Sequence, residues 1–157
     1  MNSTAIDRLR SLRVSDAMSP HVFSVRSDQT LGQAARIFGE RHITWAPVVD
    51  ENGRCVGVFS VADLLKHKES AAVPSFDSDE PVSAFMTSNV YTTAQDALLL
   101  DAAATMSDRH VHRLPVVDGD GRLHGVLSTM DVVAALLHAV EEMNSDLLSD
   151  LRRERQS

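Results

Sequence analysis

Cysteine is nearly absent from the chain, because Cys55 is the only one among 157 residues. A single cysteine excludes an internal disulfide and any cysteine-rich zinc site. Since Cys55 lies in an apolar stretch, we expect a buried thiol rather than a reactive one. Aromatic residues are also scarce, and Trp45 is the only tryptophan. A lone tryptophan mostly supplies buried area, so Trp45 is interpreted as a packing side chain.

Positive charge is in deficit, since 15 Lys and Arg residues stand against 22 Asp and Glu residues, a net charge of −7. This balance disfavours a dedicated nucleic-acid-binding protein, which needs a basic face. No apolar run approaches the roughly 20 residues of a membrane span. Residues 1–13 contain no apolar core typical of a signal peptide. We therefore expect a soluble cytoplasmic protein.

Motifs of catalysis and metal binding are missing as well. The chain has no Ser-His-Asp order, no phosphate-binding Gly-rich loop with lysine, no Gly-x-Gly-x-x-Gly and no metalloprotease motif. Zinc needs three or four convergent ligands, whereas His110 and His112 have no acidic or thiol partner at a fixed spacing. We expect no enzyme activity, no metal site and no required cofactor.

The chain does contain a stretch of sequence that occurs twice. Residues 47–63 and 115–131 share Pro-Val-Val-Asp, Gly-Arg, Gly-Val and Ser-x-x-Asp at identical spacing. Extended upstream without a gap, the same offset pairs Val14 with Val82. About 20 of some 52 aligned positions are identical. A fixed internal period of this kind dictates the architecture.

Each copy predicts the same order of elements, strand–helix–strand–strand–helix. Hydrophobic periodicity and turn residues predict strands over 22–25, 45–50 and 54–59, with helices from 30 and from 60 to about 67; the second copy has strands over 90–93, 114–118 and 122–127, with helices over 98–110 and from 129. A strand–helix–strand crossover makes its two strands parallel, and the following turn makes an antiparallel hairpin.

The fold class predicted is therefore α+β, with two βαββα repeats. A repeat of about 50 residues is marginal alone, so we expect the two to pack together as a pseudo-twofold pair that buries their apolar helical faces. The predicted segments are an N-terminal helix (1–13), repeat 1 (14–67), a linker (68–81), repeat 2 (82–138) and a C-terminal helical extension (139–157).

The Ser-x-x-Asp motif, Ser60 to Asp63 and Ser128 to Asp131, falls where a strand leads into a helix. One interpretation is a capping box, in which serine and aspartate satisfy backbone amides at the helix start. The other is a binding site, because a helix N-terminus holds anions and the carboxylate can accept two hydrogen bonds from a ribose diol. The glycine ahead of each serine lets another group approach the backbone closely. The two roles are compatible.

The residues before each proline differ between the copies. Arg113 could bind a phosphate bidentately, or it is a solvated arginine at a strand edge. Trp45, its counterpart, cannot bind a phosphate. Beyond the second motif, an apolar row continues along the last helix and suggests a dimer interface: Val133, Leu136, Leu137 and Val140.

Taken together, these motifs resemble a tandem pair of CBS (cystathionine β-synthase) domains, a Bateman module, over about residues 14–138. The resemblance rests on Met18-Ser-Pro, Pro47-Val-Val-Asp50 with Gly53, and Gly57-x-x-Ser60-x-x-Asp63, given twice. It implies a regulatory module, often a disc-shaped dimer, that binds an adenosine nucleotide or S-adenosylmethionine between the repeats.

The resemblance also implies roles for individual residues. Asp63 and Asp131 would bind ribose, and Ser60 and Ser128 would bind ribose or phosphate. The remaining implied contacts are His112 and Arg113 to phosphate, with Val22, Val90 and the backbone around Ala46 and Leu114 flanking the adenine. Thr44-Trp45 replaces the basic pair in the first copy, so a weaker or Trp45-filled cleft is expected there.

The function expected is that of a stand-alone CBS pair that forms a homodimer. It would bind AMP, ADP or ATP, with AMP favoured, and act on an unknown partner protein in trans. The alternatives are a ligand-free dimeric scaffold, in which the Ser-x-x-Asp pairs only cap helices, and a sensor of another adenosyl ligand such as S-adenosylmethionine.

Overall fold

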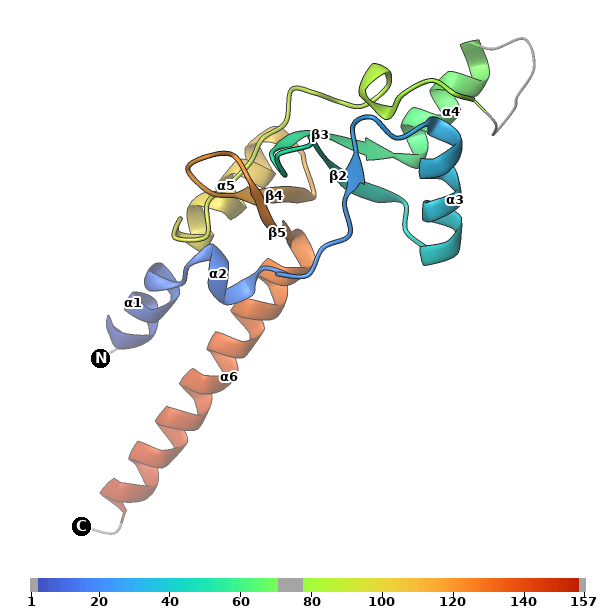
Figure 1. Cartoon of the computed structure of the whole chain (residues 1–157). Helices are drawn as coiled ribbons and strands as arrows, with labels where there is room; N and C mark the ends of the chain where they lie inside the picture. Colours follow the sequence, from blue (N-terminus) through green and yellow to red (C-terminus); the bar gives the residue numbers. More distant parts are fainter. Residues whose placement is uncertain (1–2, 71–77, 156–157) are drawn as a thin grey trace. The chain divides into compact units, whose positions relative to one another are not determined.

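The computed structural model describes residues 3–70 and 78–155, with side chains for 6–66 and 78–155. Half of the predicted linker, 68–81, falls outside the described residues, namely 71–77, and residues 68–70 belong to the helix that ends at Ser70. Helices and small sheets follow one another along the chain (Figure 1), which confirms the α+β class. The elements are α1 (Ser3–Ser11), α2 (Val14–Ala17), β1 (Val25–Arg26), α3 (Leu31–Arg41), β2 (Trp45–Val49), β3 (Cys55–Ser60), α4 (Val61–Ser70), η1 (Val82–Ala84), α5 (Leu99–Arg109), β4 (Arg113–Val117), β5 (Leu123–Ser128) and α6 (Thr129–Glu154).

The first-copy elements form the predicted topology. β1 pairs with β2 in parallel and β2 with β3 antiparallel, so the crossover helix α3 joins two parallel strands. Thr30 begins α3 with a capping box, accepting the Gln33 amide while the Gln33 side chain accepts the Thr30 amide. Leu31, Ala34 and Phe38 then bury one face of that helix.

Two strand predictions were wrong in extent. The strand expected over 22–25 is only the two residues of β1, and the one expected over 90–93 is a single parallel bridge from Thr93 to Val116. The second sheet therefore has two strands, β4 and β5. The sequence explains why the second copy has only a bridge where the first has β1. Val25 in β1 is fully buried, whereas its counterpart Thr93 is half-buried. Thr93 is also followed by Ala94, and alanine is depleted in strands.

The chain divides into two compact units that do not follow the two repeats. Unit 1 comprises residues 1–20, 93–116 and 125–157, and unit 2 comprises residues 21–92 and 117–124. Each unit thus takes the first residues of one repeat and packs them with the body of the other. Val14 lies in the core of unit 1 beside α5 and α6 residues, and Val82 lies in the core of unit 2 beside α3 and β2 residues.

The same hydrogen bonds secure the exchanged segment in both units. In unit 1 the Val14 amide donates to Ala97 O (2.9 Å) and the Leu99 amide to Leu12 O (2.8 Å). In unit 2 the equivalent bonds, at the same repeat offset, join the Val82 amide to Gln29 O (2.8 Å) and the Leu31 amide to Glu80 O (2.9 Å). The internal repeat therefore extends to backbone contacts that no local sequence pattern predicts.

Candidate functional site

The second Ser-x-x-Asp motif forms a complete capping box at the start of α6. The Ser128 amide donates to Asp131 Oδ2 (2.8 Å), and the Asp131 amide donates to Ser128 Oγ (3.1 Å). The predicted cap is confirmed here. Within the described part of the chain, the other carboxylate oxygen of Asp131, Oδ1, accepts no hydrogen bond. The half-buried Asp131 can therefore cap α6 and still accept hydrogen bonds from a ligand.

The first motif differs in detail. Asp63 Oδ2 accepts both the Ser60 amide (2.9 Å) and the Ser60 hydroxyl (3.1 Å), so the hydroxyl is a donor to its own motif partner. Asp63 is also buried, with 8% of its surface exposed. The two copies of one sequence motif thus give an accessible carboxylate at α6 and an enclosed one at α4.

The helix N-terminus offers fewer free amides than expected for anion binding. The Thr129 amide donates to His112 O (2.9 Å), and the Asp131 amide is taken by Ser128. Of the first three amides of α6, Met130 N–H is the one without a bond to the described residues. A phosphate at this site would therefore depend mainly on side-chain cations.

A pocket of about 540 Å³ brings the second-copy residues together within unit 1. This volume is in the usual range for small-molecule sites, about 300–1,000 Å³. Four predicted site residues line it: two from the basic pair before β4's proline and two from the α6 cap. The complete lining is Ser19, His112, Arg113, Val126, Ser128, Thr129, Met130 and Asp131.

Sequence reasoning missed four lining residues, and Ser19 is the one of them that comes from the first repeat; the others are Val126, Thr129 and Met130. Ser19 precedes the first repeat's strand, yet its amide donates to Val126 O (3.0 Å) and its carbonyl accepts the Val126 amide (3.1 Å). A Cβ at Gly125 would lie 2.5 Å from Ser19 O, so only glycine allows this approach. The close group anticipated beside the glycine is thus the chain's own backbone. Thr87 and Gly57, the counterparts of Ser19 and Gly125 in the repeat, make the equivalent contact.

The other predicted residues lie outside this pocket. Ala46 on β2 and Leu114 on β4 are fully buried at equivalent positions. Val22 and Val90 are half-buried and belong to unit 2. Their role beside an adenine stays a prediction, as does the role of Ser60 and Asp63. Trp45, in place of an arginine, is half-buried on β2, which agrees with the packing interpretation.

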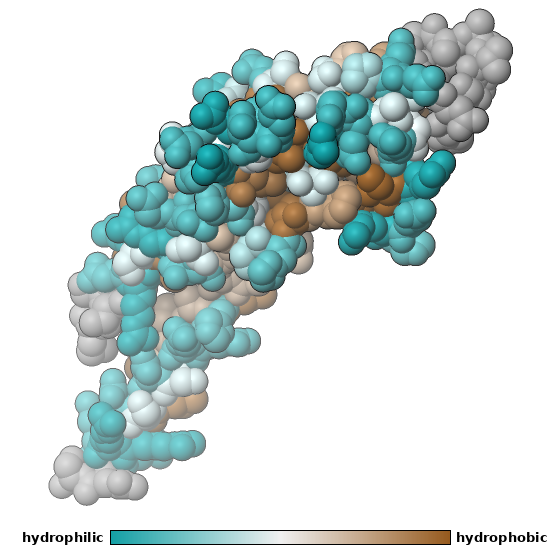
Figure 2. Space-filling view, viewed as in Figure 1, coloured by the Kyte–Doolittle hydropathy of each residue, from teal (hydrophilic) through white to brown (hydrophobic). Residues whose placement is uncertain are grey.

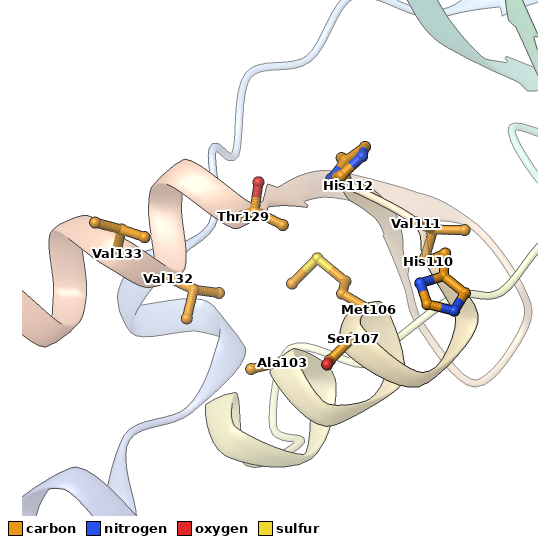
Figure 3. Close-up of a pocket in the computed structure, with 9 residues that line it drawn as sticks. All are labelled: Ala103, Met106, Ser107, His110, Val111, His112, Thr129, Val132 and Val133. Atoms are coloured by element: carbon orange, nitrogen blue, oxygen red, sulfur yellow. The ribbon is translucent and has the colours of Figure 1, made fainter.

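A second pocket, of about 510 Å³, shares His112 and Thr129 with the first. It lies between α5 and the start of α6, and Met106 extends into it from α5 (Figure 3). Its lining is mostly apolar: Ala103, Met106, Ser107, His110, Val111, His112, Thr129, Val132 and Val133. An apolar pocket beside a polar one suits a ligand with one polar and one apolar end.

Two groups outside these pockets have shifted pKa values. Burial raises the pKa of the Cys55 thiol, and the hydrogen bond from its sulfur to Gly57 O only partly offsets this. The hydrogen bond from His124 lowers the pKa of Asp118, which also accepts the Arg122 and Asp120 amides.

Across the described residues, no three His, Cys, Asp or Glu side chains converge as metal ligands. No described helix is long and apolar enough to cross a bilayer.

Several curated proteins are similar to this chain in sequence. An uncharacterized 17.7 kDa protein of Acidianus ambivalens is 30% identical over 80% of this chain and 73% of its own length. Several further curated relatives are longer, and the chain spans 21–43% of them.

Two solved structures resemble the chain and carry adenosine-type ligands. CBSX2, a CBS-pair protein of Arabidopsis thaliana, in complex with AMP is 33% identical, with a TM-score of 0.69 over 80% of this chain and 96% of that one. The CBS domain pair of protein MJ0100, in complex with 5'-methylthioadenosine and S-adenosylmethionine, is 26% identical, with a TM-score of 0.65 over 80% and 95%.

The family model named CBS domain matches residues 14–70 and again residues 82–138. The two matches are offset along the chain as the two copies of the sequence repeat are. Together they cover most of the chain, and they include both Ser-x-x-Asp motifs and the basic pair. The chain belongs to the CBS domain family, as a tandem pair.

Proposed function

We propose that the protein is a regulatory module that binds an adenine nucleotide, preferably AMP, in the pocket at the start of α6. The observation that carries this proposal is that one pocket contains a carboxylate, a serine hydroxyl and a basic pair: Asp131, Ser128, Arg113 and His112. These groups match the polar groups of a nucleoside monophosphate. Because Ser19 comes from the first repeat, the proposed site lies between the repeats, as the resemblance implies.

Each polar group has a distinct role in the proposed complex. The ribose diol donates to Asp131 Oδ1, while Oδ2 continues to cap α6. The phosphate is bound by Arg113, which is exposed and can present two N–H groups in one plane, and by His112 beside it. A charge-assisted hydrogen bond is worth about 1.5–3 kcal/mol, so each of these contacts matters to affinity.

The ligands of the similar structures support the adenosyl class. CBSX2 binds AMP, and the MJ0100 pair binds 5'-methylthioadenosine and S-adenosylmethionine. The basic pair favours AMP over 5'-methylthioadenosine, because only the nucleotide has a phosphate for Arg113. One arginine and one histidine suit one phosphate better than the longer chains of ADP or ATP.

The proposed activity is regulatory, with a partner protein acted on in trans and nucleotide level as the signal. A ligand changes function only when it binds two conformations or assemblies with different affinity. The proposed site offers such a connection, because Ser19 leads back to α2 and Ser128 begins α6. AMP held between them would bias how these two segments pack.

Calorimetric titration of the purified chain with AMP, ADP, ATP and S-adenosylmethionine tests the proposal. We expect one site per chain, tightest for AMP, and at least a tenfold loss of affinity in Asp131→Asn and in Arg113→Ala. Asp63→Asn is the matched control and should leave the AMP affinity of this site unchanged. No heat with any of the four ligands at millimolar concentration would refute the proposal.

A ligand-free scaffold is the second candidate, and the complete capping box at α6 favours it. Asp131→Ala separates the two functions. If Asp131 only caps the helix, its removal should lower the unfolding free energy by about 1 kcal/mol, and no ligand binding should be detectable before or after the substitution. As a ribose ligand, its removal would abolish AMP binding in a chain that remains folded by circular dichroism.

A further inference from the structure

The pocket at the start of α6 offers a ligand one accessible apolar side chain, that of Met130. Six of the eight residues around the pocket are polar, and Val126 is almost fully buried, with 7% of its surface exposed. Met130 is 70% exposed, the largest exposed fraction of any large apolar side chain described. Adenosine has an apolar base as well as polar hydroxyls, so within this pocket the base has Met130 to pack against.

The place of Met130 in the helix directs its thioether toward the pocket. Met130 is the second residue of α6, which begins at Thr129. Side chains of a helix point back toward its N-terminus, and the cap at that end, Ser128 with Asp131, lines the pocket. The counterpart of Met130 in the first repeat is Ala62, so only the second copy has a sulfur at this position.

Solvent access separates Met130 from the other methionines. Exposure alone is not unusual, because single apolar side chains on a surface are common, and Figure 2 shows apolar residues interspersed with hydrophilic ones over the visible surface. Met106, however, is 3% exposed, and Met18, Met86 and Met143 are half-buried. Since oxidation of sulfur follows exposure, a peroxide should reach Met130 before the other described methionines.

We propose that Met130 packs against the adenine of the bound nucleotide and makes its affinity sensitive to oxidation, an inference that rests on the proposed function of the same pocket. A thioether sulfur makes favourable contacts with aromatic rings. Hydrogen peroxide transfers one oxygen atom to the Met130 sulfur: the O–O bond breaks, an S–O bond forms, the sulfur is oxidised by two electrons and the peroxide is reduced to water. The sulfoxide is polar and hydrated, so the base must displace water from it and AMP binds more weakly.

Calorimetric titration of the full chain with AMP, before and after peroxide treatment, tests the inference. Peptide mass spectrometry of timed samples identifies which methionines have gained an oxygen. We expect Met130 to be oxidised first, and protein oxidised at Met130 to bind AMP about tenfold more weakly. Methionine sulfoxide reductase with a dithiol should restore the affinity, because the sulfoxide returns to the thioether while the dithiol becomes a disulfide and water is released.

Protection by the ligand is the second measurement. Saturating AMP should slow the oxidation of Met130 about fivefold or more, because the base covers the sulfur. Inorganic phosphate at the same concentration is the control and should not protect Met130, since it has no base to place on the thioether.

Met130→Leu separates the sulfur from the apolar shape. Leucine keeps an apolar side chain for the base, so this variant should bind AMP up to about threefold more weakly and should lose the peroxide response. Met143→Leu is the matched control, because it removes another methionine of α6 that lies outside the pocket. Its AMP affinity should respond to peroxide as the wild type does.

Three results would each overturn the inference while leaving AMP binding intact: unchanged AMP affinity in protein oxidised at Met130, a full peroxide response in Met130→Leu, or equal oxidation rates of Met130 with and without AMP. Absence of AMP binding to the untreated protein would instead refute the proposed function, and the role of Met130 with it. The two failures are therefore distinguishable.

Discussion

At the scale of single residues, the site depends on glycine at position 125, because glycine has no Cβ atom. A Cβ at Gly125 would lie 2.5 Å from Ser19 O, and the equivalent atom at Gly57 would lie 2.7 Å from Thr87 O. Sequence reasoning identified both glycines as places of close approach. It could not identify the approaching group, because Ser19 and Gly125 are far apart in the chain and belong to different repeats.

Gly125→Ala should therefore lower the unfolding free energy by about 1–3 kcal/mol, the usual cost of overpacking. Urea denaturation followed by circular dichroism measures it. Gly119→Ala is the control, because a Cβ there meets no atom within 4 Å and its backbone is not left-handed. If the two variants were equally stable, the close contact with Ser19 would be disproved.

Cys55 gives a prediction in pH. Burial raises its pKa, so the folded protein holds less thiolate than the unfolded chain at any pH near the ordinary thiol value. The sign follows: iodoacetamide should react more slowly with the folded protein, and the rate should rise with a midpoint above that of the urea-unfolded chain. Mass spectrometry of timed samples measures both rates. A midpoint equal to or below that of the unfolded chain would contradict the burial.

At the scale of elements, local chemistry predicted the helices well. Thr30 caps α3, Ser128 caps α6, and both Gly-containing turns appear where expected, with φ of 78° at Gly53 and 81° at Gly121. The weaker strands were not predictable in the same way. A two-residue strand such as β1 depends on its partner strand rather than on its own sequence.

Helix α5 ends in a feature that the sequence only partly indicated. His110 is the C-cap in a left-handed conformation, with φ of 54°, as His42 is for α3, with φ of 53°. In this conformation the Cβ of histidine lies too close to the following carbonyl oxygen, whereas glycine has no Cβ. His110→Gly should therefore raise the unfolding free energy by about 1 kcal/mol. Thermal and urea unfolding measure it.

Ala104→Gly, on the exposed side of the same helix, is the matching control and should lose about 1 kcal/mol, because glycine is a poor helix former. Destabilisation by both glycine substitutions would show that the left-handed C-cap does not strain His110.

At the scale of the whole molecule, the repeat is a unit of sequence but not of packing. Val14 fills the core that second-copy residues build, and Val82 fills the core that first-copy residues build. The constant repeat offset predicted the duplication, the fold class and the motif residues. It could not predict the exchange, because both repeats share the same pattern of apolar and motif residues, and that pattern allows a segment to pack on its own copy or on the other.

Residues 82–138 expressed alone should consequently not fold as a monomer. The fragment lacks Val14 and Ser19, and its own Val82 segment has lost its unit 2 core. Folding is expected only when two fragments exchange segments, so the urea midpoint should rise with protein concentration. Circular dichroism at several concentrations measures it, with the intact chain as control. A folded monomeric fragment would contradict the exchanged packing.

The central claim is that the pocket at the start of α6 binds AMP through Asp131 and Arg113. A crystal structure of the protein grown with AMP tests it most directly. The account predicts the ribose hydroxyls within hydrogen-bond distance of the Asp131 carboxylate and the phosphate on the Arg113 guanidinium, with Ser19 beside them. AMP bound elsewhere, or a pocket that stays empty at saturating AMP, would contradict the account.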